Sequence, residues 1–139
     1  MVVTARSLKN YRAMDAKRVL LICDTDKNEL NRIQQAFEEK GYDVETINDA
    51  GQLIGRVEKR QHSVIIVNPD LPGFREDDIC RKVMKEMRKP LLFLIDKNST
   101  TRAQISDCDP DDVVTKPVEL NNLINLVDKH VAVTASNSR

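Results

Sequence analysis

The sequence lacks the features that mark several classes of protein. Its 139 residues include 22 Lys+Arg and 22 Asp+Glu, so net charge gives no indication of a nucleic-acid or membrane partner. The longest apolar runs, such as residues 19–23 and 90–95, fall far short of the roughly 20 residues that cross a bilayer. Residues 1–17 contain no continuous apolar core of signal-peptide length. We therefore expect neither a transmembrane helix nor a secretion signal.

Cysteines are few and far apart. Cys23, Cys80 and Cys108 form no CxxC or CxxxC spacing, and their number is odd. This pattern favours neither a zinc site nor a disulfide framework. The reducing cytoplasm is the expected location.

Motifs for common cofactors are missing as well. The sequence has no GxGxxG and no GxxxxGK(S/T), which argues against dinucleotide and P-loop chemistry. The acidic run at residues 107–112 lacks the ligand spacing and the central glycine of an EF-hand. His62 and His130 are single and distant in sequence, so we expect surface histidines rather than a catalytic or metal pair. We expect no cofactor.

The composition is that of an ordinary folded domain. Hydrophobic residues make up 40% and charged residues 32%, far from the signature of disorder. The length suits a single domain. We expect an N-terminal extension at residues 1–17, a domain at 18–132 and a flexible, polar tail at 133–139.

Short apolar runs alternate with amphipathic helical patterns from Arg18 nearly to the end of the chain. This alternation predicts a parallel sheet with right-handed crossovers, an α/β fold that is doubly wound, with helices on both faces. Several of the runs are continuous, which is typical of strands covered on both faces. The five expected strands lie at residues 19–23, 44–47, 64–67, 91–95 and 113–114.

Capping and turn residues mark the ends of the expected helices. Asp26 can cap the first helix and Gly41 can end it, while Asn48 or Asp49 can cap the second. The remaining helices are expected at about residues 76–88, as a short helix within 98–112, and from about residue 119 onward.

Ligands of doubly wound sheets bind outside the carboxyl ends of the strands. Functional residues are therefore expected directly after the strands, at Cys23-Asp24, Asn68, Ile95-Asp96 and Thr115-Lys116-Pro117.

These residues and their order resemble the receiver domain of two-component response regulators, the CheY-like superfamily. The resemblance covers about residues 17–131 and is carried by RVLLICDTD, GYDVETINDA, HSVIIVNPDLPG and DDVVTKPVELNNLI. It implies a flavodoxin-like five-stranded sheet with strand order 2-1-3-4-5. In this family, an acidic pair after strand one and an aspartate after strand three hold a divalent cation. That aspartate accepts phosphate, and a Ser/Thr after strand four and a lysine after strand five contact the phosphoryl group.

The sequence departs from the family pattern at several of these positions. The position of the phosphoacceptor is Asn68, whose neutral amide cannot act as the nucleophile. The acidic pair is Cys23-Asp24, so Asp24 is the one carboxylate left and any Mg²⁺ site is weak. Ile95 replaces the hydroxyl residue and Val113 the switch aromatic. One engineered replacement at position 68 would not explain the other differences.

Other family positions are retained. Lys116 and Pro117 match the Lys-Pro after strand five; with no phosphate to meet, the ammonium is expected to pair with Asp24, and the resemblance implies a cis bond before Pro117. Asp70 occupies a position that in the family offers its backbone carbonyl to the metal. The thiol of Cys23 is expected to stay protonated beside Asp24.

The sequence thus favours a pseudo-receiver that binds another protein and is not an enzyme. Its partner would be a signalling protein or a component of a histidine-kinase pathway. A partner or homodimer face is expected on helix four, strand five and helix five, including parts of residues 101–107 and 119–129. Two alternatives stay open: a phosphorylatable regulator that uses another carboxylate such as Asp70, and a flavodoxin-like ligand binder.

Overall fold

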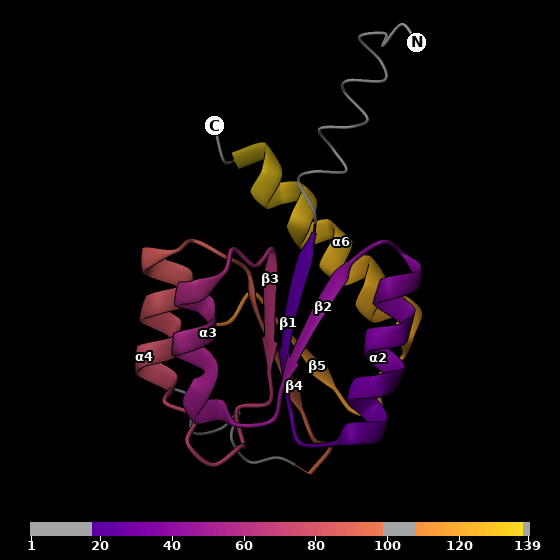
Figure 1. Ribbon diagram of the computed structural model, residues 1–139, viewed down its shortest axis with the longest axis horizontal. Helices are drawn as coiled ribbons and strands as arrows, with labels where there is room; N and C mark the ends of the chain where they lie inside the picture. Colours follow the sequence, from indigo (N-terminus) through magenta and orange to yellow (C-terminus); the bar gives the residue numbers. More distant parts are fainter. Residues whose placement is uncertain (1–17, 99–107, 138–139) are drawn as a thin grey trace, which may run out of the picture.

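The computed structural model describes residues 18–98 and 108–137 (Figure 1). Strands and helices alternate along the chain as the apolar pattern predicts. Their order is β1 (Val19–Cys23), α2 (Lys27–Glu39), β2 (Asp43–Ile47), the 3₁₀ turn η1 (Ala50–Gln52), α3 (Leu53–Lys59), β3 (Val64–Val67), α4 (Glu76–Cys80), the π-helix η2 (Arg81–Glu86), β4 (Leu91–Ile95), β5 (Asp112–Thr115) and α6 (Leu120–Asn137).

The strands form one five-stranded sheet in the order β2-β1-β3-β4-β5. All neighbouring strands are parallel, so the predicted fold and strand order are confirmed. Cys23 pairs in register with Ile47 on one side and Val67 on the other. Parallel pairing in this register brings the carboxyl ends of the strands to the same edge of the sheet, where the site residues were expected.

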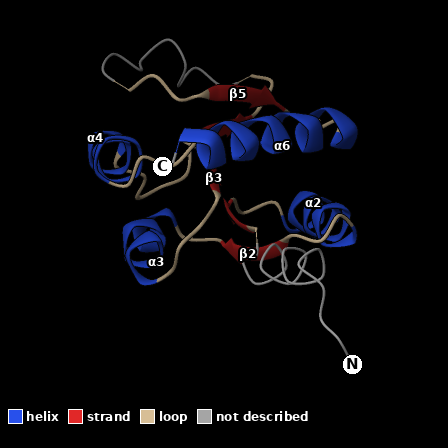
Figure 2. Cartoon of the chain, turned by 90° about the horizontal axis from the view of Figure 1, so that it is seen from above, coloured by secondary structure: helices blue, strands red, loops and turns tan. Residues whose placement is uncertain are grey.

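Helices cover both faces of the sheet (Figures 1 and 2). One face packs against α2 and α6 and buries residues such as Ile22, Phe37 and Val127. The other packs against α3 and α4 and buries residues such as Leu53 and Val83. The central strands β1, β3 and β4 are buried along their whole lengths, because both of their faces are covered.

Local capping residues set the ends of the first helix as predicted. Asp26 Oδ1 accepts a hydrogen bond from the Glu29 amide at 3.1 Å at the start of α2. Gly41, with φ +92°, follows the end of this helix and occupies the left-handed conformation that favours glycine.

The next helices differ in detail from the expected pattern. Asp49, rather than Asn48, caps η1, because its Oδ1 accepts from the Gly51 amide at 2.9 Å. The helix expected at about 76–88 is α4 followed directly by the π-helix η2, in which the Met87 amide bonds back to the Lys82 carbonyl at 2.9 Å. Residues 99–107, which include most of the expected short helix, lie outside the described residues.

The last helix is longer than expected. Its buried stripe, Leu123, Ile124 and Val127, matches the predicted face. However, α6 continues to Asn137, past residue 132, where the domain was expected to end. None of the described helices is both long and apolar enough to cross a membrane.

Two cysteines correct the sequence interpretation. Cys80 at the end of α4 and Cys108 before β5 form a disulfide with Cα atoms 5.9 Å apart, whereas no disulfide was expected. Their sequence separation is 28, so no local spacing indicates that they meet. They meet because the topology brings both into the same buried layer. Cys23 remains a free, buried thiol.

The histidines were expected on the surface, but His62 is buried and His130 is only partly exposed. His62 is 1% exposed, and its Nε2 lies 2.7 Å from Glu45 Oε1 on β2. His130 Nε2 lies 2.8 Å from Asp112 Oδ2, and its side chain is 16% exposed. Each histidine is thus paired with a carboxylate of an edge strand, which a lone histidine in a sequence does not reveal.

Candidate functional site

Three polar side chains meet at the carboxyl edge of the sheet. Asp24 follows β1, Asn68 follows β3 and Lys116 follows β5. Asp24 is 1% exposed and Asn68 is 3% exposed, so this is a nearly closed polar site within an apolar core. Buried polar groups need partners, and each of these side chains has one within the group.

The predicted ion pair between Asp24 and Lys116 is confirmed. Lys116 Nζ lies 2.6 Å from Asp24 Oδ2, and the two side chains are 13% and 2% exposed. Asp24 Oδ1 accepts from the Thr25 amide at 2.7 Å. The carboxylate is therefore held by a cation on one oxygen and by its own loop on the other.

Lys116 is also close to a second carboxylate. Asp96 Oδ1 lies 3.5 Å from its Nζ, although the Asp96 side chain is 56% exposed. Burial alone would lower the pKa of Lys116, but its contacts with Asp24 and Asp96 outweigh burial and raise that pKa. The peptide bond from Lys116 to Pro117 is cis, as the family resemblance implied. Asp96 was expected at this edge but not as a partner of the lysine.

Asn68 is fixed by contacts on both ends of its amide. Its Nδ2 donates to Asp24 Oδ1 at 3.4 Å, and its Oδ1 accepts from the Asp70 amide at 2.9 Å. The second bond is the local Asx turn that asparagine and aspartate commonly form. Asp70 thus contacts the site through its backbone, and the residue itself is exposed.

Cys23 is an inert neighbour of this network. Its side chain is 0% exposed, and its pKa is raised from 9.0 to about 12. Burial is the largest cause, with the charges of Asp24 and Asp49 adding to it. The thiol is therefore protonated at neutral pH, as expected, but mainly for a different reason than the charge of Asp24.

The positions of the missing hydroxyl and aromatic residues are apolar. Ile95 is 9% exposed at the end of β4, and Val113 on β5 packs against the same hydrophobic cluster. Neither side chain can donate a hydrogen bond to a phosphoryl oxygen.

The family resemblance implies a magnesium site at this edge, but the residues do not fit one. Mg²⁺ prefers oxygen ligands arranged around it, usually carboxylates and waters. Here Cys23 offers a protonated thiol, Asn68 Oδ1 is bonded to the Asp70 amide, and Asp24 is already paired with Lys116. At Cys23, Asp24 and Asn68, the positions that the family resemblance assigns to the metal, the one carboxylate is that of Asp24, and Lys116 already neutralises its charge.

Known proteins resemble this chain in sequence and fold. The family model of the response regulator receiver domain matches residues 20–128. A CheY-like response regulator receiver domain protein from Methanospirillum hungatei JF-1 has a TM-score of 0.75 and 20% identity, with 86% of this chain and 98% of that chain covered. The signal receiver domain of a putative Luxo repressor protein from Vibrio parahaemolyticus has a TM-score of 0.73 and 14% identity, covering 88% and 95%.

A third similar structure was determined with its metal. The receiver domain of a sensor histidine kinase from Pseudomonas aeruginosa PAO1, with a magnesium ion coordinated in its active-site cleft, has a TM-score of 0.72 and 16% identity, covering 84% of this chain and 98% of that chain. The strand order and the helices on both faces are those of the CheY-like α/β fold. The chain belongs to the response regulator receiver family.

Proposed function

We propose that this chain is a pseudo-receiver, a receiver domain of two-component signalling that binds a protein partner without aspartyl phosphorylation at the usual position. The observation that supports this most is the closed contact of Asn68, Asp24 and Lys116. An aspartyl phosphate requires an ionised carboxylate as nucleophile, and Asn68 presents an amide there.

The charges of the site support the same proposal. In a phosphorylatable receiver, the lysine after β5 contacts the phosphoryl group. Here Lys116 already has Asp24 at 2.6 Å and Asp96 at 3.5 Å. The pair satisfies both charges inside the protein, so the site has a structural role, holding the ends of β1 and β5 to each other.

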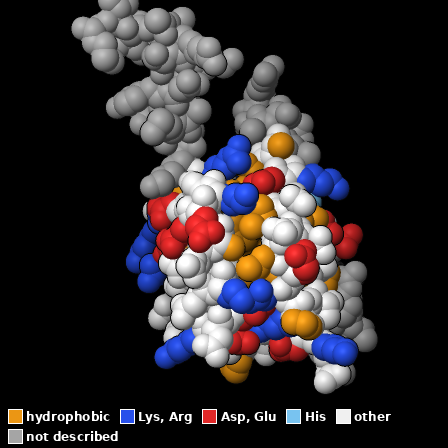
Figure 3. Space-filling view, turned by 90° about the vertical axis from the view of Figure 1, so that its right-hand side faces the viewer, with side chains coloured by type: hydrophobic (Ala, Val, Ile, Leu, Met, Phe, Trp, Pro, Cys, Tyr) orange, Lys and Arg blue, Asp and Glu red, His pale blue; other side chains and the backbone are white. Residues whose placement is uncertain are grey.

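Receiver domains interact with signalling proteins such as histidine kinases, and the same class of partner is proposed here. The partner or homodimer face expected from the sequence includes β5 and the first turns of α6. Figure 3 shows a strip of hydrophobic side chains between charged ones on the side of the molecule that carries α2. The hydrophobic residues that are only partly buried against that side's core are Ala36, Val114, Leu120, Leu126 and Val131. Most of them lie on β5 and α6. Residues 101–107 of the expected face lie outside the described residues.

A cytoplasmic location and a domain that begins at residue 18 remain part of the proposal, and the domain's end follows α6, which continues to Asn137. Cytoplasm is where a partner of the histidine-kinase class would be met. The bounds can be tested by limited proteolysis, which should trim residues 1–17 and leave a stable core.

The second candidate is phosphorylation on Asp70, since this carboxylate is exposed beside the site. Incubation with acetyl phosphate and Mg²⁺, followed by intact-mass analysis and Phos-tag electrophoresis, separates the two. We expect no phosphoryl addition under conditions that label an active receiver. Labelling that disappears in Asp70→Asn would establish the second candidate and contradict the pseudo-receiver.

A further inference from the structure

The strand β2 forms one edge of the sheet in the described part of the chain, and basic side chains lie beside it. We propose that the edge strand β2 docks an acidic, extended segment of a partner protein, which adds beside β2 as a sixth strand. This inference rests on the proposed function in one respect, that the chain acts by binding a protein. It does not depend on the state of Asn68.

Some backbone groups of β2 point away from its one strand partner in the described residues, β1. In the described part of the chain, β2 lies at the end of the sheet and pairs with β1. The Asp43 amide donates to the Arg18 carbonyl at 2.9 Å, and the Ile47 carbonyl accepts from the Asp24 amide at 3.1 Å. In an extended strand, the N–H and C=O of one residue point to the same side, and successive residues alternate. Val44 and Thr46 therefore direct their backbone groups away from β1, toward the open edge.

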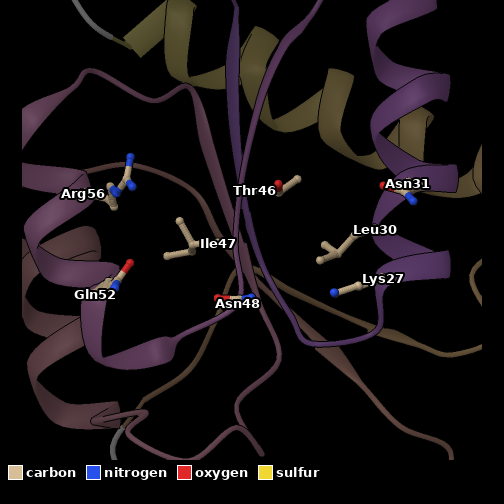
Figure 4. A pocket seen from close by; sticks show the side chains of 8 residues that line it. All are labelled: Lys27, Leu30, Asn31, Thr46, Ile47, Asn48, Gln52 and Arg56. Atoms are coloured by element: carbon tan, nitrogen blue, oxygen red, sulfur yellow. The ribbon is translucent and has the colours of Figure 1, made fainter.

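A groove of about 320 Å³ lies at the carboxyl end of this edge, beside Thr46, Ile47 and Asn48. Figure 4 shows its lining from three directions: Lys27, Leu30 and Asn31 from α2, Gln52 and Arg56 from η1 and α3, and Thr46, Ile47 and Asn48 between them. Since α2 and α3 cover opposite faces of the sheet, the groove lies where the next strand of the sheet would continue. Its walls would thus contact both faces of an added strand.

The residues that line the groove favour a negatively charged ligand. Two of its residues are basic, and none is acidic. Lys27 is exposed and has no ion-pair partner among residues 18–98 and 108–137. Arg56 Nη1 lies 2.6 Å from Glu45 Oε2, but its side chain remains 48% exposed and keeps further N–H donors for a second carboxylate.

An added strand fits these cations better than other occupants. Successive side chains of a strand point to opposite faces, so two adjacent acidic residues would reach Lys27 on the α2 side and Arg56 on the α3 side. A second copy of this chain, docked edge to edge, would bring the same cations together. Residues 1–17 carry four basic residues and one acidic residue, which disfavours them as the occupant.

Addition of a strand to an exposed sheet edge is a common mode of peptide recognition. Backbone hydrogen bonds supply affinity, and pockets beside the edge supply specificity. In this edge the specificity comes from charge, because the groove is lined by cations, amides and a hydroxyl over a small apolar floor of Leu30 and Ile47.

The test titrates the full chain with a blocked, valine-rich peptide that carries two adjacent glutamates. Binding is followed by backbone NMR shifts and by hydrogen exchange. We expect shifts at Lys27, Asn48 and Gln52, and slowed exchange at the amides of Val44 and Thr46, which gain acceptors. A peptide with lysines in place of the glutamates should not bind. The same acidic peptide with an N-methylated residue opposite Thr46 should lose most of its affinity.

Charge variants of the protein complete the test. Lys27→Glu and Arg56→Gln should each weaken binding by up to about fivefold, the upper end of what an exposed ion pair contributes. Arg56→Gln keeps a hydrogen-bond donor for Glu45, which protects the fold. Lys85→Glu on η2 is the matched control and should change nothing.

Two outcomes would overturn the inference: absence of binding by the acidic peptide, or binding without protection of Val44 and Thr46. Neither outcome bears on phosphorylation, which is measured separately by acetyl-phosphate labelling. Phosphoryl labelling of the chain would contradict the proposed function but would not affect the inference that β2 docks an added strand.

Discussion

The ammonium of Lys116 lies 2.6 Å from Oδ2 of Asp24, at the carboxyl edge of the parallel sheet. The pair is buried, so its strength depends on both partners being present. Removing one partner of a buried pair leaves an uncompensated charge, whereas removing both does not.

Stability should therefore respond strongly to loss of the lysine alone. Lys116→Met should lower the free energy of unfolding by about 3 kcal/mol or more, because Asp24 would be left buried and unpaired. The double variant Asp24→Asn with Lys116→Met should recover much of that loss. Urea unfolding measures both, with Lys97→Met on the exposed loop after β4 as control. A loss no larger than that of the control would mean that the ion pair is not a structural feature of the fold.

The raised pKa of Cys23 predicts that the free energy of unfolding depends on pH under alkaline conditions. Its pKa is raised in the folded protein from 9.0 to about 12, so the unfolded chain releases this proton first. The stabilising effect is fully present below pH 9 and is lost as the pH rises from about 9 to about 12, by at most about 1.4 kcal/mol per pH unit. Unfolding of wild type and Cys23→Ala across this range should show a shallower pH dependence in the variant. Parallel curves would refute the assigned pKa.

The thiol itself should be unreactive. At pH 8, iodoacetamide should modify Cys23 only after denaturant is added, because the side chain is both buried and protonated. Rapid alkylation of the native protein would show that this edge of the sheet opens.

The Cys80–Cys108 disulfide should contribute to stability. It closes a loop with a sequence separation of 28, for which chain entropy gives about 3 to 4 kcal/mol. The Cys80→Ser, Cys108→Ser double variant should be destabilised by about this amount, and reductant should affect the wild type alone. Intact mass under non-reducing conditions checks the bond, since free thiols at both positions would add two hydrogens. That mass in the purified protein would contradict the disulfide.

Magnesium should bind weakly, with a Kd of about 1 mM or higher, because the donor set offers one carboxylate that already pairs with Lys116. Isothermal titration calorimetry of the wild type measures this directly. Binding in the micromolar range would require Asp24 to leave its lysine, and would contradict the description of the site.

Local sequence signals predicted most of the fold. A continuous apolar run such as Val64–Val67 by itself indicates a strand that is buried on both faces. Asp26 caps a helix by accepting a hydrogen bond from the amide of Glu29, only three residues away. The Asp24–Lys116 pair could be predicted because family resemblance placed both residues at strand ends. The cis bond before Pro117 was implied in the same way.

Contacts between residues far apart in the sequence could not be predicted in this way. Cys80 and Cys108 meet because helix α4 and the approach to β5 share one layer of the fold, which spacing along the chain does not reveal. His62 is buried against Glu45 of the edge strand β2, although none of the residues next to His62 in the sequence indicates its burial. The groove beside β2 likewise depends on two helices that cover opposite faces of the sheet.

The most direct test of the central claim is acetyl-phosphate labelling of the Asn68→Asp variant, compared with a variant that also carries Cys23→Asp and Ile95→Thr. The claim is that several positions, not Asn68 alone, prevent phosphorylation. Intact mass after incubation with Mg²⁺ should show little labelling of the single variant, because it still lacks the second metal-binding carboxylate and the hydroxyl. Restoring all three positions should increase labelling. Efficient labelling of Asn68→Asp alone would contradict the account.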